Sequence, residues 1–190
     1  MIDLNSEIKK TNEVLKNGGI ILYPTDTIWG IGCDATNAEA VKKIFQLKKR
    51  SAEKNLILLL DTASRLPSYI KEVPENAWSL IEFSSKPLTI IYDGAKNLPL
   101  EVVADDGSIA IRITQDEFCN KLIGLFKKPL VSTSANISGT PWPACYDDIS
   151  DDIKIGVDYT VQWRLTEKSQ IQPSTILYLK SNGQIKFIRP

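Results

Sequence analysis

A hydroxyl-rich stretch follows the apolar run Pro129-Leu130-Val131 and reads Ser132-Thr133-Ser134-Ala135-Asn136-Ile137-Ser138-Gly139. Such side chains bond to nearby backbone N–H groups, so the stretch could cap a turn or a helix start. It could also cradle an anionic ligand, because open α/β sheets bind ligands at the carboxyl ends of their strands. Taken alone, the stretch favours the turn. The other polar clusters of the chain decide between the two interpretations.

Three further clusters could bind the same anion. Each also has a structural interpretation: threonines shape turns, cations complement the carboxyl end of a helix, and an arginine can point to solvent from an edge strand. Each cluster is expected next to a strand or helix end, so together they favour a shared anion-binding site without identifying the ligand. The clusters are the loop Thr25-Asp26-Thr27, the cations Lys48, Arg50 and Lys54, and Arg112 within Ile109–Ile113.

Several kinds of chemistry are excluded. The chain has no histidine, which excludes Ser-His-Asp and Cys-His hydrolases and any histidine-ligated metal. It also lacks the P-loop, dinucleotide-binding, nucleophile-elbow and HExxH motifs. What remains is catalysis by positioning, in which cations and N–H or O–H donors hold an anionic substrate. Phosphoryl and nucleotidyl transfer fit this description, because a departing pyrophosphate needs charge compensation rather than an acid–base pair.

Composition indicates an ordinary globular protein without a global charge. The 190 residues include 23 basic and 23 acidic side chains, which cancel, so no net field draws the chain to nucleic acid or a membrane. The three cysteines are widely spaced, which argues against a disulfide framework and a zinc site. The longest apolar runs are too short to span a bilayer and the amino terminus lacks a signal-peptide core. We therefore expect a reduced, cytoplasmic protein with no membrane segment.

The hydrophobic pattern predicts a mixed α/β fold in which helices and strands alternate early and strands dominate late. Residues 24–32 are expected to form a polar loop, and Asn182-Gly183 to turn a hairpin. We expect helices at 6–17, 38–49, 74–83 and 118–126, and strands at 20–23, 56–60, 87–92, 108–113, 129–131, 159–163, 174–179 and 184–188.

Several of these motifs, in their order, resemble the YrdC-type family of threonylcarbamoyl-AMP synthases. Residues Tyr23 to Gly30, YPTDTIWG, are similar to the family's first loop, and Lys48-Lys49-Arg50 to its K-x-R element. The resemblance extends from about Asn5 to Pro190 and is to the short bacterial form. It implies a single domain over residues 1–190 with an α/β fold, a YrdC-like twisted open mixed sheet flanked by helices. The later matching motifs are Lys86-Pro87-Leu88-Thr89, Ile109-Ala110-Ile111-Arg112, Ser132 to Gly139, Pro173-Ser174-Thr175-Ile176 and Arg189.

The resemblance also implies a reaction. L-Threonine, bicarbonate and ATP would give threonylcarbamoyl-AMP and pyrophosphate, with Mg²⁺ accompanying the triphosphate. The product would pass to tRNA-modification partner proteins that modify adenosine 37. Carried over by position, Thr27, Arg112 and Ser174 would bind threonine, and Lys48 and Arg50 would be catalytic. The ATP-binding residues would be Arg50, Lys54, Ser108, Ser132, Ser134, Asn136 and Arg189.

One departure and two alternatives stay open. Pro141-Trp142-Pro143 stands where the family usually has proline-serine-proline, so Trp142 could replace a serine contact by stacking. A non-catalytic module that binds double-stranded RNA or tRNA is one alternative, although zero net charge and few aromatic residues near the basic cluster argue against strong RNA affinity. The other is a paralogue of the same fold that acts on another carbamoylated or adenylated substrate.

Overall fold

A computed structural model of the chain describes residues 3–49, 56–167 and 173–189. The strands are β1 (Ile21–Tyr23), β2 (Gly30–Gly32), β3 (Ile57–Leu60), β4 (Leu88–Tyr92), β5 (Ile109–Ile113), β6 (Leu130–Ser134), β7 (Tyr159–Thr160), β8 (Thr175–Leu179) and β9 (Ile185–Arg189). The helices are α1 (Leu4–Lys16), α2 (Ala38–Leu47), α3 (Leu66–Tyr69), α4 (Asn76–Glu82), α5 (Glu117–Phe126) and α6 (Asp151–Gly156), with single 3₁₀ turns at Ala63–Arg65 and Tyr146–Asp148.

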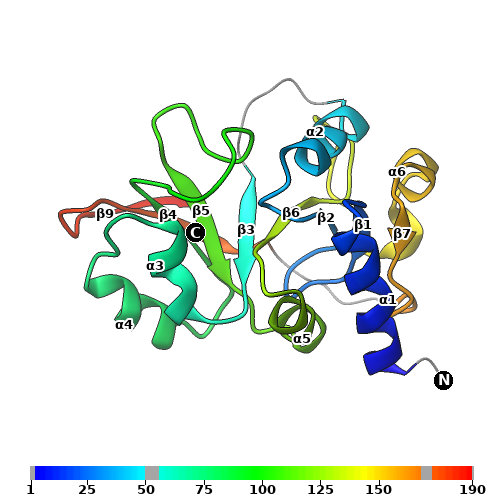
Figure 1. Cartoon of the computed structure of the whole chain (residues 1–190), viewed down its shortest axis with the longest axis horizontal. Helices are drawn as coiled ribbons and strands as arrows, with labels where there is room; N and C mark the ends of the chain where they lie inside the picture. The colour runs from blue at the N-terminus through cyan, green and yellow to red at the C-terminus, as the bar shows by residue number, and fades with distance from the viewer. Residues whose placement is uncertain (1–2, 50–55, 168–172, 190) are drawn as a thin grey trace.

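The strands form one open, mixed sheet in the order β7-β1-β2-β6-β3-β5-β4-β8-β9, with helices on both sides (Figure 1). The pairs β1–β7, β3–β5 and β4–β8 are parallel, and the other neighbours are antiparallel. This arrangement confirms the predicted mixed α/β sheet.

Helix ends are fixed by the expected capping chemistry. Asp3 accepts the Ser6 N–H at the start of α1, and Asn37 accepts two N–H groups at the start of α2. Asp116 accepts the Cys119 N–H at 2.9 Å at the start of α5. A side-chain acceptor at this position satisfies an N–H group that the first helical turn leaves without a partner. Residue types therefore set these boundaries locally.

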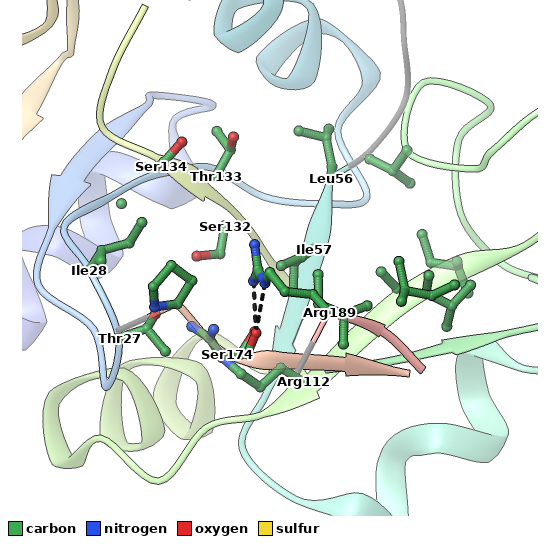
Figure 2. Close-up of a pocket in the computed structure, with 18 of the residues that line it drawn as sticks. Thr27, Ile28, Leu56, Ile57, Arg112, Ser132, Thr133, Ser134, Ser174 and Arg189 are labelled. Carbon is green, nitrogen blue, oxygen red and sulfur yellow. Dashed lines mark hydrogen bonds between the residues drawn. The ribbon is translucent and has the colours of Figure 1, made fainter. Parts of the chain in front are cut away.

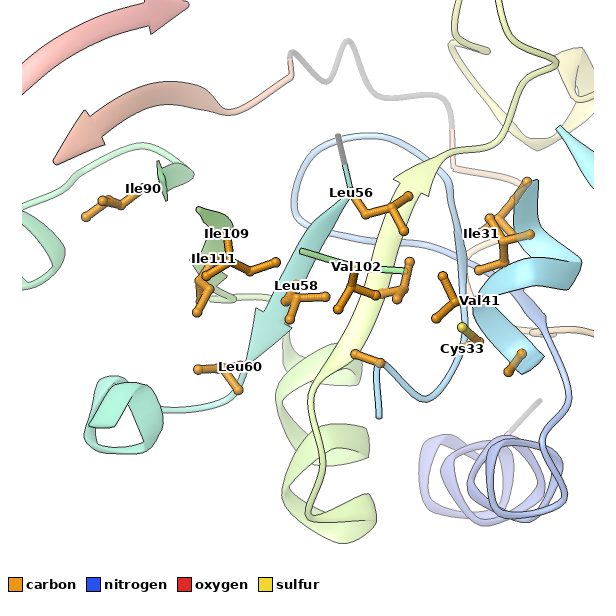
Figure 3. Packing of buried hydrophobic residues seen from close by; sticks show 14 of the residues in the cluster. Ile31, Cys33, Val41, Leu56, Leu58, Leu60, Ile90, Val102, Ile109 and Ile111 are labelled. Carbon is orange, nitrogen blue, oxygen red and sulfur yellow. The ribbon is translucent and has the colours of Figure 1, made fainter. Parts of the chain in front are cut away.

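One face of the sheet carries the main hydrophobic core. Successive side chains of a strand point to opposite faces, so Leu58 and Leu60 of β3 share this face with Ile109 and Ile111 of β5 (Figure 3). The same core includes apolar residues of α2, α3, α4 and α6. These helices therefore cover this face.

The opposite face is covered by α1 and α5 over part of its area. These two helices bury Leu59 of β3 and Leu130 of β6 in a second core. Ile57, Arg112 and Ser132 have the same facing as Leu59 and Leu130, since register pairs Leu59 with Arg112 and Ile57 with Ser132. Ile57 packs against the edge of that second core, and all three residues line a cavity. The alternation of the strands thus brings polar side chains to one uncovered area.

Residues 30–32, expected as part of a loop, form strand β2 between β1 and β6. Gly-Ile-Gly has weak intrinsic strand preference, so only the packing explains this strand. A Cβ atom on Gly32 would lie 2.6 Å from both the Tyr23 ring and the Val131 carbonyl oxygen. A glycine is required here because the neighbouring strand and ring approach so closely.

Other boundaries also differ from expectation. Ser132, Thr133 and Ser134 belong to β6 and not to the following loop, because Ser132 pairs with Ile57 and Ser134 with Gly30. The strand expected over 159–163 ends at Thr160. α3 and α6, both short, were not expected. The predicted turn at Asn182-Gly183 is confirmed: Lys180 N donates to Gln184 O at 2.9 Å, and Gly183 has φ of +83°.

Candidate functional site

The uncovered area of the second face is a cavity of about 440 Å³, a size typical of small-molecule sites. Its walls come from strands on both sides of β3, so residues distant in sequence face one another (Figure 2). Apolar side chains such as Ile57, Ile91 and Ile176 form part of the wall. The polar lining residues are Thr27, Ser108, Arg112, Ser132, Thr133, Ser134, Ser174 and Arg189.

Arg112 is a buried cation on β5 with a free hydrogen-bond donor. The residue is 3% exposed, and its Nη2 lies 3.1 Å from Asp26 Oδ1. The contact is an ion pair without hydrogen-bond alignment, and Arg112 Nε has no hydrogen-bond partner among the described residues. A buried donor without a partner is unfavourable. The side chain is therefore prepared to bind an anionic ligand.

Arg189 supplies the second positive charge, from the end of β9. Its Nε and Nη2 donate to the Ser174 carbonyl oxygen at 3.0 and 2.8 Å (Figure 2). Burial, and then the like charge of Arg112, lower the pKa of the Arg189 guanidinium. Ser174 is itself held by Thr89, whose hydroxyl lies 2.8 Å from the Ser174 Oγ. Two arginines facing one cavity make it electropositive, which suits a carboxylate or a phosphate.

The loop after β1 presents Thr27 to the cavity. Thr25 Oγ1 accepts the Thr27 N–H at 3.0 Å, lies 3.0 Å from Thr27 Oγ1, and donates to Ile28 O at 2.8 Å. Thr25 and Thr27 are both buried. This local network fixes the Thr27 hydroxyl, as expected for threonines that shape a turn.

Lys48, the residue that ends α2, supports the segment after β6. It is 2% exposed, and its Nζ donates to Ser134 O at 2.5 Å, to Asn136 O at 2.7 Å and to Asn136 Oδ1 at 3.4 Å. Asn136 also accepts from Ser134 Oγ and donates through Nδ2 to Thr140 O at 2.5 Å. The sequence left two interpretations of the hydroxyl-rich stretch open, and both describe it. The stretch forms a turn that its own side chains hold, and it forms a wall of the cavity.

Ser108 is a lining residue that directly precedes β5. Its N–H donates to Asp106 Oδ1 at 2.9 Å. A side-chain bond to Ser108, and then this backbone bond, lower the pKa of Asp106. The Ser108 residue is 5% exposed and lines the cavity.

The structure brings seven of the predicted site residues into one cavity. Lys48 and Asn136 lie behind the wall that Ser132 and Ser134 form and are not among the lining residues. Arg50 and Lys54 fall outside the described residues. The seven residues that line the cavity are Thr27, Ser108, Arg112, Ser132, Ser134, Ser174 and Arg189.

Four further residues belong to the site or hold it. Asp26 pairs with Arg112, Thr89 contacts Ser174, and Thr133 and Trp142 line the cavity. Asp26 and Thr89 stand within motifs quoted above, but only the folded chain shows that they face Arg112 and Ser174. Trp142 is 54% exposed at the cavity, so it combines a large aromatic surface with access to a ligand.

Two negative findings hold for the described ranges 3–49, 56–167 and 173–189. They contain no group of three or more His, Cys, Asp or Glu side chains that could hold a metal ion. None of their helices is long and apolar enough to cross a membrane. All three cysteines are free thiols.

Comparisons with known proteins agree on one family. The sequence model of the Sua5/YciO/YrdC family, described as "Telomere recombination", matches residues 13–190. A threonylcarbamoyl-AMP synthase of Pseudoalteromonas translucida is 36% identical over 166 residues, which cover 85% of this chain and 87% of that protein. A threonylcarbamoyl-AMP synthase of Pyrococcus abyssi is 32% identical over 161 residues, 77% of this chain and 47% of that longer protein.

Solved structures share the fold. P. abyssi Sua5 complexed with L-threonine superposes with a TM-score of 0.87 at 27% identity, covering 100% of this chain and 55% of that one. Escherichia coli YciO superposes with a TM-score of 0.82 at 21% identity, covering 100% of this chain and 90% of that one. The predicted open mixed sheet is therefore the architecture of these proteins.

Proposed function

Because the chain belongs to the Sua5/YciO/YrdC family, we propose that it is an L-threonylcarbamoyladenylate synthase, a nucleotidyltransferase. It makes threonylcarbamoyl-AMP and pyrophosphate from L-threonine, bicarbonate and ATP, and the product serves tRNA modification. The observation that carries this proposal is the cavity with two facing arginines and a hydroxyl wall, in a chain 36% identical to a synthase over 85% of its length.

Threonine binds at the Arg112 side of the cavity. The threonine carboxylate takes the unpartnered Nε of Arg112, together with the adjacent guanidinium N–H groups. Thr27 and Ser174 supply hydroxyl groups within the same cavity. This assignment is supported by burial, since a charge-assisted pair strengthens where water is excluded.

ATP binds along the hydroxyl wall and Arg189. Ser132 and Ser134 offer donors on β6, Ser108 offers a further hydroxyl group in the cavity lining, and Asn136 holds the turn after Ser134. Lys48 and Arg50 are the catalytic cations of this proposal, and Lys54 assists them. Lys48 contributes its charge from behind the wall, while Arg50 and Lys54 lie outside the described residues.

The reaction needs no nucleophilic side chain. The threonine amine combines with bicarbonate to give a carbamate and water, and a carbamate oxygen then attacks the α-phosphorus in line. The bond from that phosphorus to the bridging oxygen breaks, and pyrophosphate leaves with the electron pair. The cations stabilise the charge on the departing oxygens, and the fixed walls align the reactants.

Mg²⁺ enters this proposal as the companion of the triphosphate. Mg²⁺ usually keeps several waters and binds through one or two carboxylates and the substrate phosphates. The cavity wall offers the hydroxyl oxygens of Ser132, Thr133 and Ser134. These oxygens would hold the ion directly or through water. When bound, the ion would neutralise phosphate charge.

The partners that follow from this function are tRNA-modification proteins that accept the adenylate, in the cytoplasm. A non-catalytic module for double-stranded RNA or tRNA is not favoured, because the matching relatives are named as synthases. The net charge of zero also gives no general attraction to RNA.

The test is pyrophosphate release by the purified chain with ATP, threonine, bicarbonate and Mg²⁺, with the adenylate identified by mass spectrometry. We expect pyrophosphate release to require both threonine and bicarbonate. Release that does not depend on threonine, or no release, would contradict the proposal. Release with carbamoyl phosphate in place of threonine would favour the paralogue that acts on another substrate.

A further inference from the structure

We propose that Arg164, which does not line the cavity, is a positioning residue. It holds the 25–27 loop and thereby the threonine-binding side of the site. The expected effect of Arg164 on the KM for threonine rests on the proposed function, whereas its effect on the loop does not.

Arg164 joins three segments that are distant in sequence. Its Nη1 forms an ion pair with Asp116 Oδ2 and its Nε with Glu167 Oε2. Its Nη2 donates to the Thr25 carbonyl oxygen at 3.4 Å. Asp116 uses its other oxygen to cap α5. The guanidinium therefore connects the start of α5 to the loop after β1.

The backbone of Arg164 is held in an unfavourable conformation. Its φ is +60°, in the left-handed region that residues with a Cβ atom rarely adopt. Such conformations persist where the surrounding contacts determine them, and they gather at functional sites. The side-chain contacts to Asp116 and Glu167 hold this residue together with a backbone bond, in which the Glu167 N–H donates to the Arg164 carbonyl oxygen at 3.1 Å.

The Thr25 carbonyl is a sensitive point of the loop. It belongs to the peptide that joins Thr25 to Asp26, and Asp26 pairs with Arg112. Thr25 Oγ1 in turn bonds to Thr27. A rotation of this peptide would therefore move the partner of Arg112 and the hydroxyl of Thr27 together.

Two further contacts join α5, and the residue just before its N-cap, to this loop. Gln115 N donates to Asp26 Oδ2 at 3.3 Å, and Cys119 Sγ donates to Pro24 O at 3.4 Å. These bonds are about as long as the 3.4 Å bond from Arg164 to the Thr25 carbonyl oxygen. Arg164 differs from Gln115 and Cys119 because its guanidinium is a charged donor that is also anchored by Asp116 and Glu167.

The chain contains a matched control pair. Arg65 Nε lies 3.2 Å from Asp61 Oδ1, with side chains 23% and 12% exposed. The Arg164 and Asp116 side chains are 24% and 6% exposed. Neither Arg65 nor Asp61 lines the cavity. A purely structural role for Arg164 predicts the same effects from both substitutions.

The experiment compares Arg164→Met with Arg65→Met in the full chain. Methionine keeps an apolar stem and removes the charge and donors. Hydrogen–deuterium exchange reports on the peptide that contains the Thr27 amide, and steady-state kinetics report on both substrates. We expect Arg164→Met, and not Arg65→Met, to raise exchange in residues 24–29 and to raise the KM for threonine about tenfold, with the KM for ATP changed less than about twofold. Arg164→Lys, which keeps one contact at a time, should fall between.

Unchanged exchange in residues 24–29, or equal KM changes in the two methionine variants, would overturn the proposal. If the wild-type chain releases no threonine-dependent pyrophosphate, the proposed function fails and the exchange measurement alone decides the role of Arg164.

Discussion

At the residue scale, Arg112 shows most directly how the fold forms an anion-binding position. The Arg112 side chain is positively charged and only 4% exposed. Asp26 forms an ion pair with one of its nitrogens, Nη2. A buried guanidinium is favourable only where anions complete its surroundings. The remaining donor and the positive charge together favour an anionic ligand at this place.

Arg112→Lys should raise the KM for threonine more than the KM for ATP. Lysine keeps the charge beside Asp26 but loses the planar, two-donor geometry that fits a carboxylate. Loss of a hydrogen bond to a charged group costs about 1.5–3 kcal/mol, so we expect the threonine KM to rise roughly 10- to 100-fold. Initial rates at varied threonine and at varied ATP measure both values. The reverse ordering would assign Arg112 to the nucleotide.

Trp142 is the residue for which the sequence left the role open. It lines the cavity with half of its surface exposed, and aromatic surfaces stack on nucleobases with about 1–3 kcal/mol per base. We predict that Trp142→Ser weakens ATP binding by roughly 5- to 100-fold by calorimetry, with threonine binding unchanged. Trp78, which is 38% exposed on α4 and absent from the cavity lining, provides the control substitution Trp78→Ser. Equal ATP affinity in wild type and Trp142→Ser would exclude stacking.

At the scale of elements, the end of α2 and the turn after β6 behave as one unit. Lys48 Nζ donates to acceptors on Ser134 and Asn136, and the Lys48 carbonyl oxygen accepts the Ser138 N–H at 3.1 Å. A helix end thus determines where the hydroxyl wall lies. The family resemblance implies a catalytic role for this lysine, and the structure adds its support of the turn.

Lys48→Met separates support of the turn from direct contact with phosphate. Leaving buried acceptors without a donor costs about 1–3 kcal/mol each, so we expect a loss of roughly 2–4 kcal/mol and a fall in melting temperature of about 5–15 °C. Lys43→Met is the control, because Lys43 is exposed and donates to the single acceptor Gly18 O at 3.2 Å. Differential scanning calorimetry measures both. An unchanged melting temperature with lost activity would instead indicate that Lys48 contacts the substrate.

The elements also show what sequence could predict. Periodicity and caps predicted most helices and strands, and the ordered motifs predicted seven lining residues, because each signal is local. The sequence did not predict strand β2, because its formation depends on the Tyr23 ring and the Val131 carbonyl group packing against Gly32. The pair between Asp26 and Arg112 and the contact of Arg164 with Thr25 join residues that are far apart in the sequence. Such contacts arise only from the sheet order.

At the scale of the molecule, the cavity spans the continuous sheet. Thr27 and Ser132 belong to the β1–β2–β6 side, whereas Ser174 and Arg189 belong to the β4–β8–β9 side, and β3 and β5 join the two. A ligand that contacts both walls connects the two sides of one sheet. Bound ligand should therefore stabilise the whole chain rather than a single lobe.

Ligand-dependent melting tests this whole-molecule consequence. A ligand at 100 times its Kd stabilises the folded state by about 2.7 kcal/mol, which for a chain of this size raises the melting temperature by roughly 5–10 °C. We expect ATP with Mg²⁺, and separately threonine, to move one single unfolding transition upward by this amount in calorimetry. Arg112→Lys should reduce the threonine shift at the same concentration to roughly half or less and keep the ATP shift, because only the carboxylate contact is weakened. Two separate transitions, or a ligand shift confined to one of them, would show that the two sides of the sheet unfold independently and that the cavity does not connect them.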